Sequence, residues 1–211
     1  MGQRSQIFIN VEHHLVDCKG KNYVTKYLVA RYYQWNYGTR MISRAKGIIE
    51  WLLNDPQYVY FPENKIKLER VCDVNWDYHD IVLSQNILEE YSNGYYKNPF
   101  EMFTSQDNND GQLYIDLFVE TKGDETKTVL KYCFADYDFQ YLGSASKYMN
   151  WNAGRKWKAE DYLKSEVNYT TNNISYIAKH AKLMNEDEFK KFIHRNYSSY
   201  DFVSKKKEGK K

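Results

Sequence analysis

A strand-forming run followed by a helix-forming run, within residues 26–54, constrains the fold most. Residues 26–34 are rich in β-branched and aromatic residues and contain neither Gly nor Pro, which predicts a strand that Gly38 ends. Apolar residues then recur every three or four positions, the spacing of the buried face of a helix. They are Met41, Ile42, Ala45, Ile48, Ile49, Leu52 and Leu53. Because Pro56 disfavours helix in the residue before it, we expect a long amphipathic helix over residues 39–54.

Three further segments have the alternation of a strand. Residues 5–12 place Ile7, Ile9 and Val11 on one side. Residues 113–121 and 127–136 alternate around Gly123-Asp124, which predicts a hairpin. We therefore predict an antiparallel sheet of residues 5–12, 26–34, 113–121 and 127–136 packed against the helix. Residues 13–25 are expected to connect the first two strands as a polar, flexible loop that contains His13, His14 and Cys18.

The C-terminal part has helical character from about residue 158. We expect helices over residues 159–167, 172–184 and 186–197, and Asn185 followed by Glu188 has the form of a capping box. The fold class is therefore α+β. We expect a core of residues 1–157, a helical portion of residues 158–203 packed on it as part of one domain, and a disordered basic tail of residues 204–211.

Composition narrows the functional classes. The chain has 30 Lys and Arg against 28 Asp and Glu, a formal net charge of +2, so the field of the whole protein does not favour nucleic acid. Its 3 cysteines are an odd number without metal-site spacing, which indicates neither a disulfide framework nor a zinc site. The first residues are polar and charged, and no apolar run reaches the length of a membrane span. We expect a cytoplasmic protein without a membrane partner.

One cluster of residues has acid–base or metal-binding chemistry. Asp73, Asp77 and His79 lie close together in the sequence around Trp76, and carboxylates with an imidazole can bind a divalent ion or transfer protons. The spacing matches no recognised ligand pattern, and such residues are also typical of turns and helix caps. Since the chain also lacks nucleotide-binding glycine motifs and a nucleophile elbow, we expect no cofactor and no metal.

Two stripes interleave basic and aromatic residues. The first is Arg40, Arg44, Gly47 and Trp51 on the predicted helix; the second, within residues 147–158, contains Trp151, Arg155 and Trp157. Such residues form protein interfaces and also bind single-stranded nucleic acid by stacking and phosphate neutralisation. The structural alternative is that the tryptophans pack inside the protein and the arginines are solvated.

The N-terminal quarter resembles a set of small uncharacterised bacterial and phage proteins. The residues that carry the resemblance are Met1-Gly-Gln-Arg4, Tyr33-Gln-Trp35 and the glycine turn at Gly38 before a helix. Many members have an Asp-Gly-Tyr-Pro turn where this chain has Asn36-Tyr37-Gly38. The resemblance implies a phage or mobile-element setting and carries no activity.

These observations favour a non-enzymatic, protein-binding accessory factor that acts on a host protein. The first alternative is a nucleic-acid-binding protein that uses the two stripes. The second is a metal-dependent hydrolase centred on Asp73, Asp77 and His79. The sequence does not specify the oligomeric state.

Overall fold

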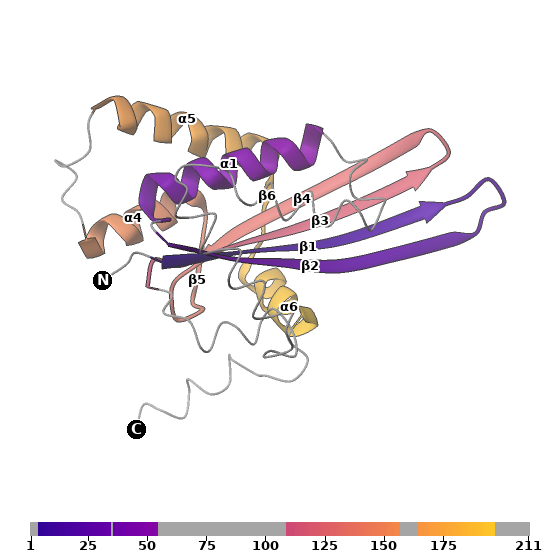
Figure 1. Ribbon diagram of the computed structural model, residues 1–211, viewed down its shortest axis with the longest axis horizontal. Helices are drawn as coiled ribbons and strands as arrows, with labels where there is room; N and C mark the ends of the chain where they lie inside the picture. The colour runs from indigo at the N-terminus through magenta and orange to yellow at the C-terminus, as the bar shows by residue number, and fades with distance from the viewer. Residues whose placement is uncertain (1–3, 35, 55–108, 157–163, 197–211) are drawn as a thin grey trace, which may run out of the picture.

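The computed structural model describes residues 4–34, 36–54, 109–156 and 164–196. This part of the chain has a mixed α+β fold built on a six-stranded sheet of order β2-β1-β3-β4-β5, with β6 also paired to β4 (Figure 1). The predicted fold class is confirmed.

The first two strands form a long hairpin. β1 (Arg4–Val16) and β2 (Asn22–Gln34) pair antiparallel along their whole length, from Arg4 with Gln34 to Val16 with Asn22. Residues 13–16 and 22–25, expected in a flexible loop, are therefore strand, and only residues 17–21 form the turn. The predicted second hairpin is also present, since β3 (Gln112–Lys122) and β4 (Glu125–Ala135) pair around the Gly123-Asp124 turn.

The sheet is mixed, not antiparallel throughout. β3 lies beside β1 and runs parallel to it, with Ile7 opposite Leu113 and Val16 opposite Lys122. The physical reason is the path of the chain. In the sequence, α1 (Gly38–Asn54) and the residues after it lie between β2 and β3, so no tight turn joins these two strands. The chain enters β3 at the same end of the sheet as β1. There Asp110 donates its amide to the Arg4 carbonyl at 2.8 Å.

Helices lie on both faces of the sheet. On one face lie α1, α4 (Ala145–Lys156) and α5 (Lys164–His180); on the other lies α6 (Glu186–Asn196). The short strands β5 (Tyr141–Gly143) and β6 (Lys182–Leu183) complete the sheet. No helix was predicted over residues 145–156, but they form α4, where the Ser144 hydroxyl accepts the Lys147 amide at 3.3 Å. The predicted tail at residues 204–211 lies outside the described residues.

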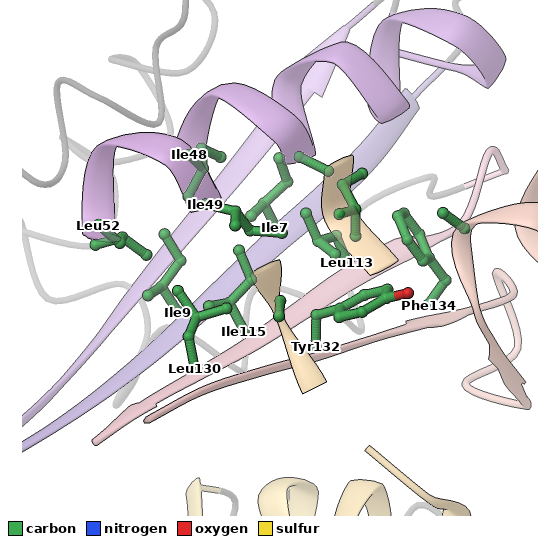
Figure 2. Close-up of a cluster of buried hydrophobic side chains, with 14 of the residues drawn as sticks. Ile7, Ile9, Ile48, Ile49, Leu52, Leu113, Ile115, Leu130, Tyr132 and Phe134 are labelled. Atoms are coloured by element: carbon green, nitrogen blue, oxygen red, sulfur yellow. The ribbon is translucent and has the colours of Figure 1, made fainter. Parts of the chain in front are cut away.

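The larger core lies between α1 and the sheet. Six residues of the predicted α1 stripe are buried, and Leu53 packs against them half-buried. The six are Met41, Ile42, Ala45, Ile48, Ile49 and Leu52. Figure 2 shows Ile48, Ile49 and Leu52 above the strand residues Ile7, Ile9, Leu113, Ile115, Leu130, Tyr132 and Phe134. Each such side chain stabilises the fold by about 1.5–3 kcal/mol before entropy is counted, so this contact fixes the position of α1.

A second core lies beneath α6. Phe189, Phe192 and Ile193 of α6 cover Phe8, Tyr114 and Cys133 of the sheet. The predicted capping box starts this helix: Glu188 donates its amide to Asn185 Oδ1 at 2.9 Å, and Asn185 donates its amide to Glu188 Oε2 at 3.0 Å. The sheet is therefore packed on both faces near the start of β1 and β3, and the two hairpins extend beyond the helices (Figure 1).

Candidate interaction surface

The end of the β1–β2 hairpin, residues 15–24, consists of the turn at residues 17–21 and the strand residues beside it, and we call it the hairpin tip. Asp17 Oδ1 accepts the amides of Lys19 and Lys21 at 2.8 and 2.9 Å, and the Tyr23 hydroxyl donates to Asp17 Oδ2 at 3.4 Å. Gly20 has φ +78°, a backbone conformation that favours glycine. The tip is therefore held by specific hydrogen bonds.

Large apolar side chains are exposed on this tip. Leu15 is 37% exposed, Tyr23 46% and Val24 48%. Leu15 and Tyr23 face each other across the two strands. Half of the six large hydrophobic residues that are exposed in the described part of the chain therefore lie within ten residues of one hairpin. Clustered apolar exposure of this kind marks interaction sites more often than scattered exposure does.

The strand β2 is an edge of the sheet. Of the described strands, only β1 pairs with it. Its 13 pairs with β1 run in one unbroken register, and its sequence has neither Gly nor Pro. Natural edge strands are commonly protected by bulges, prolines or short length, and β2 has none of these three devices.

The charges around the tip are of both signs. Lys19 and Lys21 are exposed in the turn, and the Lys21 ammonium lies 4.9 Å from the Tyr23 ring centroid. The turn of the neighbouring β3–β4 hairpin exposes Lys122, Asp124 and Glu125. Because the two hairpins carry mixed charge, their ends are more typical of a protein-binding surface than of a phosphate-binding one.

The first predicted stripe is buried at Arg44 and half-buried at Arg40 and Trp51. Arg44 is only 1% exposed; its guanidinium lies 4.0 Å from the Tyr33 ring centroid, and its Nε donates to Asn36 Oδ1 at 3.2 Å. Trp51 is half-buried and packs against the larger core, while Arg40 is half-buried beside the Tyr37 ring. The expectation that Arg44 is presented to a partner is therefore wrong, since a buried guanidinium was mistaken for a surface one.

The second predicted stripe is described only in part. Trp151 is half-buried, and its ring lies 5.9 Å from the Tyr148 ring and 6.3 Å from the exposed Tyr137 ring, measured between centroids. The side chain of Arg155, and all of Trp157, lie outside the described residues. Partner binding by these residues stays a prediction, and Trp151 has in addition a packing role.

The paired histidines lie on opposite faces of β1, not in a loop. His13 is buried, and its Nε2 lies 3.4 Å from the Thr121 hydroxyl. Burial, followed by the neighbouring His14, lowers the pKa of His13 below its usual 6.5. His14 Nε2 lies 2.6 Å from Glu12 Oε1, and its ring packs on Phe118. No third metal-ligating side chain joins Glu12 and His14 among the described residues.

The predicted acid–base cluster of Asp73, Asp77 and His79 lies outside the described residues. Elsewhere in the described ranges, no group of three or more His, Cys, Asp or Glu side chains is arranged to hold a metal ion. The metal-dependent hydrolase therefore stays a prediction from sequence.

Sequence reasoning missed the hairpin tip, because residues 13–25 were interpreted as one polar connection. A signal was available. Tyr23, Val24 and Thr25 continue the strand-forming run directly into Lys26, and Asp17 with Gly20 is a typical turn pair.

Comparison of the chain with protein-family models, with curated proteins and with solved structures finds no match in any of the three. Within the described ranges, no helix has both the length and the apolarity that crossing a membrane requires. The geometry of the chain itself is therefore the basis for a functional proposal.

Proposed function

We propose that this chain is a non-enzymatic binding protein that recognises a partner protein with its hairpin tip. The observation that carries the proposal is the exposure of Leu15, Tyr23 and Val24 on one ordered hairpin. Tyr is enriched in protein interfaces, where a rigid ring gives a large contact area with little loss of entropy. The mixed charges at the ends of the two hairpins suit the polar rim of such an interface.

The setting of the proposal follows from two observations. The exposed Cys18 and the buried Cys133 are both free thiols, which fits a reducing compartment such as the cytoplasm. The N-terminal resemblance to phage and bacterial proteins favours an accessory factor that acts on a host protein.

Site-specific photo-crosslinking tests the proposal. A benzophenone amino acid replaces Tyr23 in one variant and Tyr169 in a matched control, because Tyr169, on α5, is at least as exposed as Tyr23, at 54% against 46%. Each variant is irradiated in lysate of the cells in which the gene is native. We expect one predominant crosslinked protein from position 23 and none from position 169, and adding Val24→Ser should reduce its yield. The same products from both positions, or none from either, would contradict the proposal.

Nucleic-acid binding is the second candidate, and one observation favours it: Tyr137, which is 44% exposed, lies beside Trp151 with a ring-centroid distance of 6.3 Å. Exposed aromatic rings can stack on unpaired bases. A titration with labelled single-stranded oligonucleotide at low and high salt tests it. Binding that weakens with salt and with Tyr137→Ala would support it; absence of binding at low salt would exclude it.

A further inference from the structure

Adjacent residues at the start of β2 expose apolar side chains on opposite faces of the sheet. Successive residues of a strand point to opposite faces. Tyr23 and Val24 are consecutive, and both are nearly half exposed. Tyr23 pairs with Leu15 on one face and Val24 pairs with His14 on the other. The exposed apolar area at the tip is therefore divided between both faces of the edge strand.

This division restricts how a partner can cover the tip. A partner that docks on one face of the sheet covers either Tyr23 or Val24. A strand added alongside the outer edge of β2 covers both, because its own side chains flank the edge residues on both faces. β2 is available for such pairing as far as the described residues show, since β1 is the only described strand on it.

The positive charge of the turn indicates which side chains the added strand carries at its end beside the turn. Lys19 and Lys21 are exposed in the turn that leads into β2. Asp17, the one acidic residue of the turn at residues 17–21, already accepts the amides of Lys19 and Lys21 and the hydroxyl of Tyr23. The two ammonium groups therefore favour carboxylates on whatever lies beside the turn.

We propose that the hairpin tip binds an extended segment of the partner, apolar in its strand part and acidic at the end beside the turn, which pairs with the outer edge of β2 near residues 22–24. The segment hydrogen-bonds to the outer backbone edge of β2, covers Tyr23 and Val24, and places its carboxylates near Lys19 and Lys21. This inference rests on the proposed function and specifies the kind of partner.

Disulfide tethering at Cys18 tests the inference without knowledge of the natural partner. Cys18 is exposed in the turn and Cys133 is buried, so a full-length chain with Cys72→Ser presents Cys18 for exchange. The probe is the peptide Cys-Gly-Gly-Glu-Glu-Val-Thr-Val-Thr-Val. Its linkage to Cys18 is measured by intact mass at a fixed ratio of reduced to oxidised glutathione. One control peptide has Lys-Lys in place of Glu-Glu, and a second has proline at alternate strand positions.

We expect the acidic peptide to link with an equilibrium constant roughly fivefold above that of the lysine peptide, as two exposed ion pairs would give. The proline peptide should link about tenfold more weakly than the acidic peptide, because it cannot complete a ladder. Tyr23→Ser with Val24→Ser should reduce the preference for the acidic peptide over the proline peptide, because the added strand then covers no apolar side chain, whereas Tyr169→Ser should leave that preference unchanged. In the linked protein, alternate amides near residues 22–24 should gain protection from hydrogen exchange.

Equal linkage of all three peptides would overturn the strand-addition inference. If photo-crosslinking at position 23 still captured a single partner, the proposed function would stand and the partner would dock on one face. Selective linkage of the acidic peptide without any crosslinked partner would instead retain the strand-accepting edge and remove the support for a partner protein. The two failures are therefore distinguishable.

Discussion

At the scale of single residues, the clearest case is Arg44, a charged side chain with a structural role. Its Nε donates to Asn36 Oδ1, and Asn36 in turn donates to the Ser5 hydroxyl at 2.7 Å. The three residues connect α1, the segment before it and β1. Arg44 and Asn36 are both buried. Removing the guanidinium therefore takes away the donor to Asn36 Oδ1, and a buried acceptor without a donor costs stability.

We expect Arg44→Met to lower the free energy of unfolding by about 2–4 kcal/mol, from the lost hydrogen bond and the lost contact with the Tyr33 ring. Arg40→Met is the matched control on the same helix. Arg40 is half-buried, so its replacement should change stability by about 0.5 kcal/mol or less. Urea unfolding of both variants measures the difference, and equal losses would show that Arg44 has no special structural role.

His13 should make stability depend on pH. Burial lowers the pKa of His13 in the folded protein below the usual 6.5, so the folded state binds a proton less readily than the unfolded state. The stability that neutral His13 contributes to the folded protein is therefore fully present above about pH 6.5 and is lost as the pH falls towards the lowered pKa. We expect urea midpoints of the parent to fall between pH 7.5 and 5.5 more than those of His13→Gln, which does not titrate. Parallel pH profiles would contradict this.

At the scale of elements, the entry into β3 depends on a close approach between backbone and side chains. Gly111 has φ +86°, and a Cβ on it would lie 2.8 Å from the Ala135 carbonyl oxygen and 3.0 Å from the Trp151 ring. The Tyr148 hydroxyl donates to the Asp110 carbonyl at 2.9 Å. Gly111 therefore allows β3, β4 and α4 to meet.

Gly111→Ala should destabilise the protein by about 2–4 kcal/mol, because it adds both backbone strain and overlap. Gly20→Ala separates the two effects: Gly20 also has a positive φ, +78°, but nothing lies within 4 Å of its added Cβ. We expect about 1 kcal/mol from strain alone at Gly20. Thermal unfolding of the two variants gives the comparison, and equal losses at both positions would show that the close approach at Gly111 is unimportant.

At the scale of the whole molecule, local sequence pattern predicted some elements but not how the strands are arranged. The helices expected over residues 159–167 and 172–184 are wrong in their bounds, since α5 spans residues 164–180 and residues 182–183 form the strand β6. The helical spacing of residues such as Ile48 and Leu52 identified the buried face of α1, the Gly123-Asp124 pair placed the second hairpin, and the capping box at Asn185 placed the start of α6. The periodicity of apolar residues indicates which side of an element is buried. It carries no information about which strands become neighbours when a long connection separates them, so it could not predict the parallel pairing of β1 with β3.

The candidate surface was harder to predict than the fold, for a physical reason. Arg44 and Trp51 look like a surface stripe in the sequence, because arginine is rarely buried; the ring of Tyr33 and the amide of Asn36 that enclose Arg44 become its neighbours only after folding. The apolar residues of the hairpin tip have the opposite problem. In the sequence Leu15, Tyr23 and Val24 fall in a segment that was interpreted as a polar loop, and the projection of the hairpin beyond the helices leaves them exposed (Figure 1).

The packing of α6 against the sheet can be followed through the thiol of Cys133. This cysteine is fully buried beneath α6 in one cluster with Phe189 and Phe192, and burial raises its pKa well above the usual value. In a Cys72→Ser chain we expect Cys18 to react with Ellman's reagent at once and Cys133 to react only when α6 opens.

Phe192→Ala removes a buried ring and should destabilise the packing of α6 on the sheet by about 3–5 kcal/mol. Cys133 should then react at least a hundredfold faster than in the parent, if local opening limits the reaction. Tyr169→Ala, at an exposed ring on α5, should leave the rate unchanged. Reaction of Cys133 at the same rate in the parent and in Phe192→Ala would show that α6 does not control access to this face of the sheet.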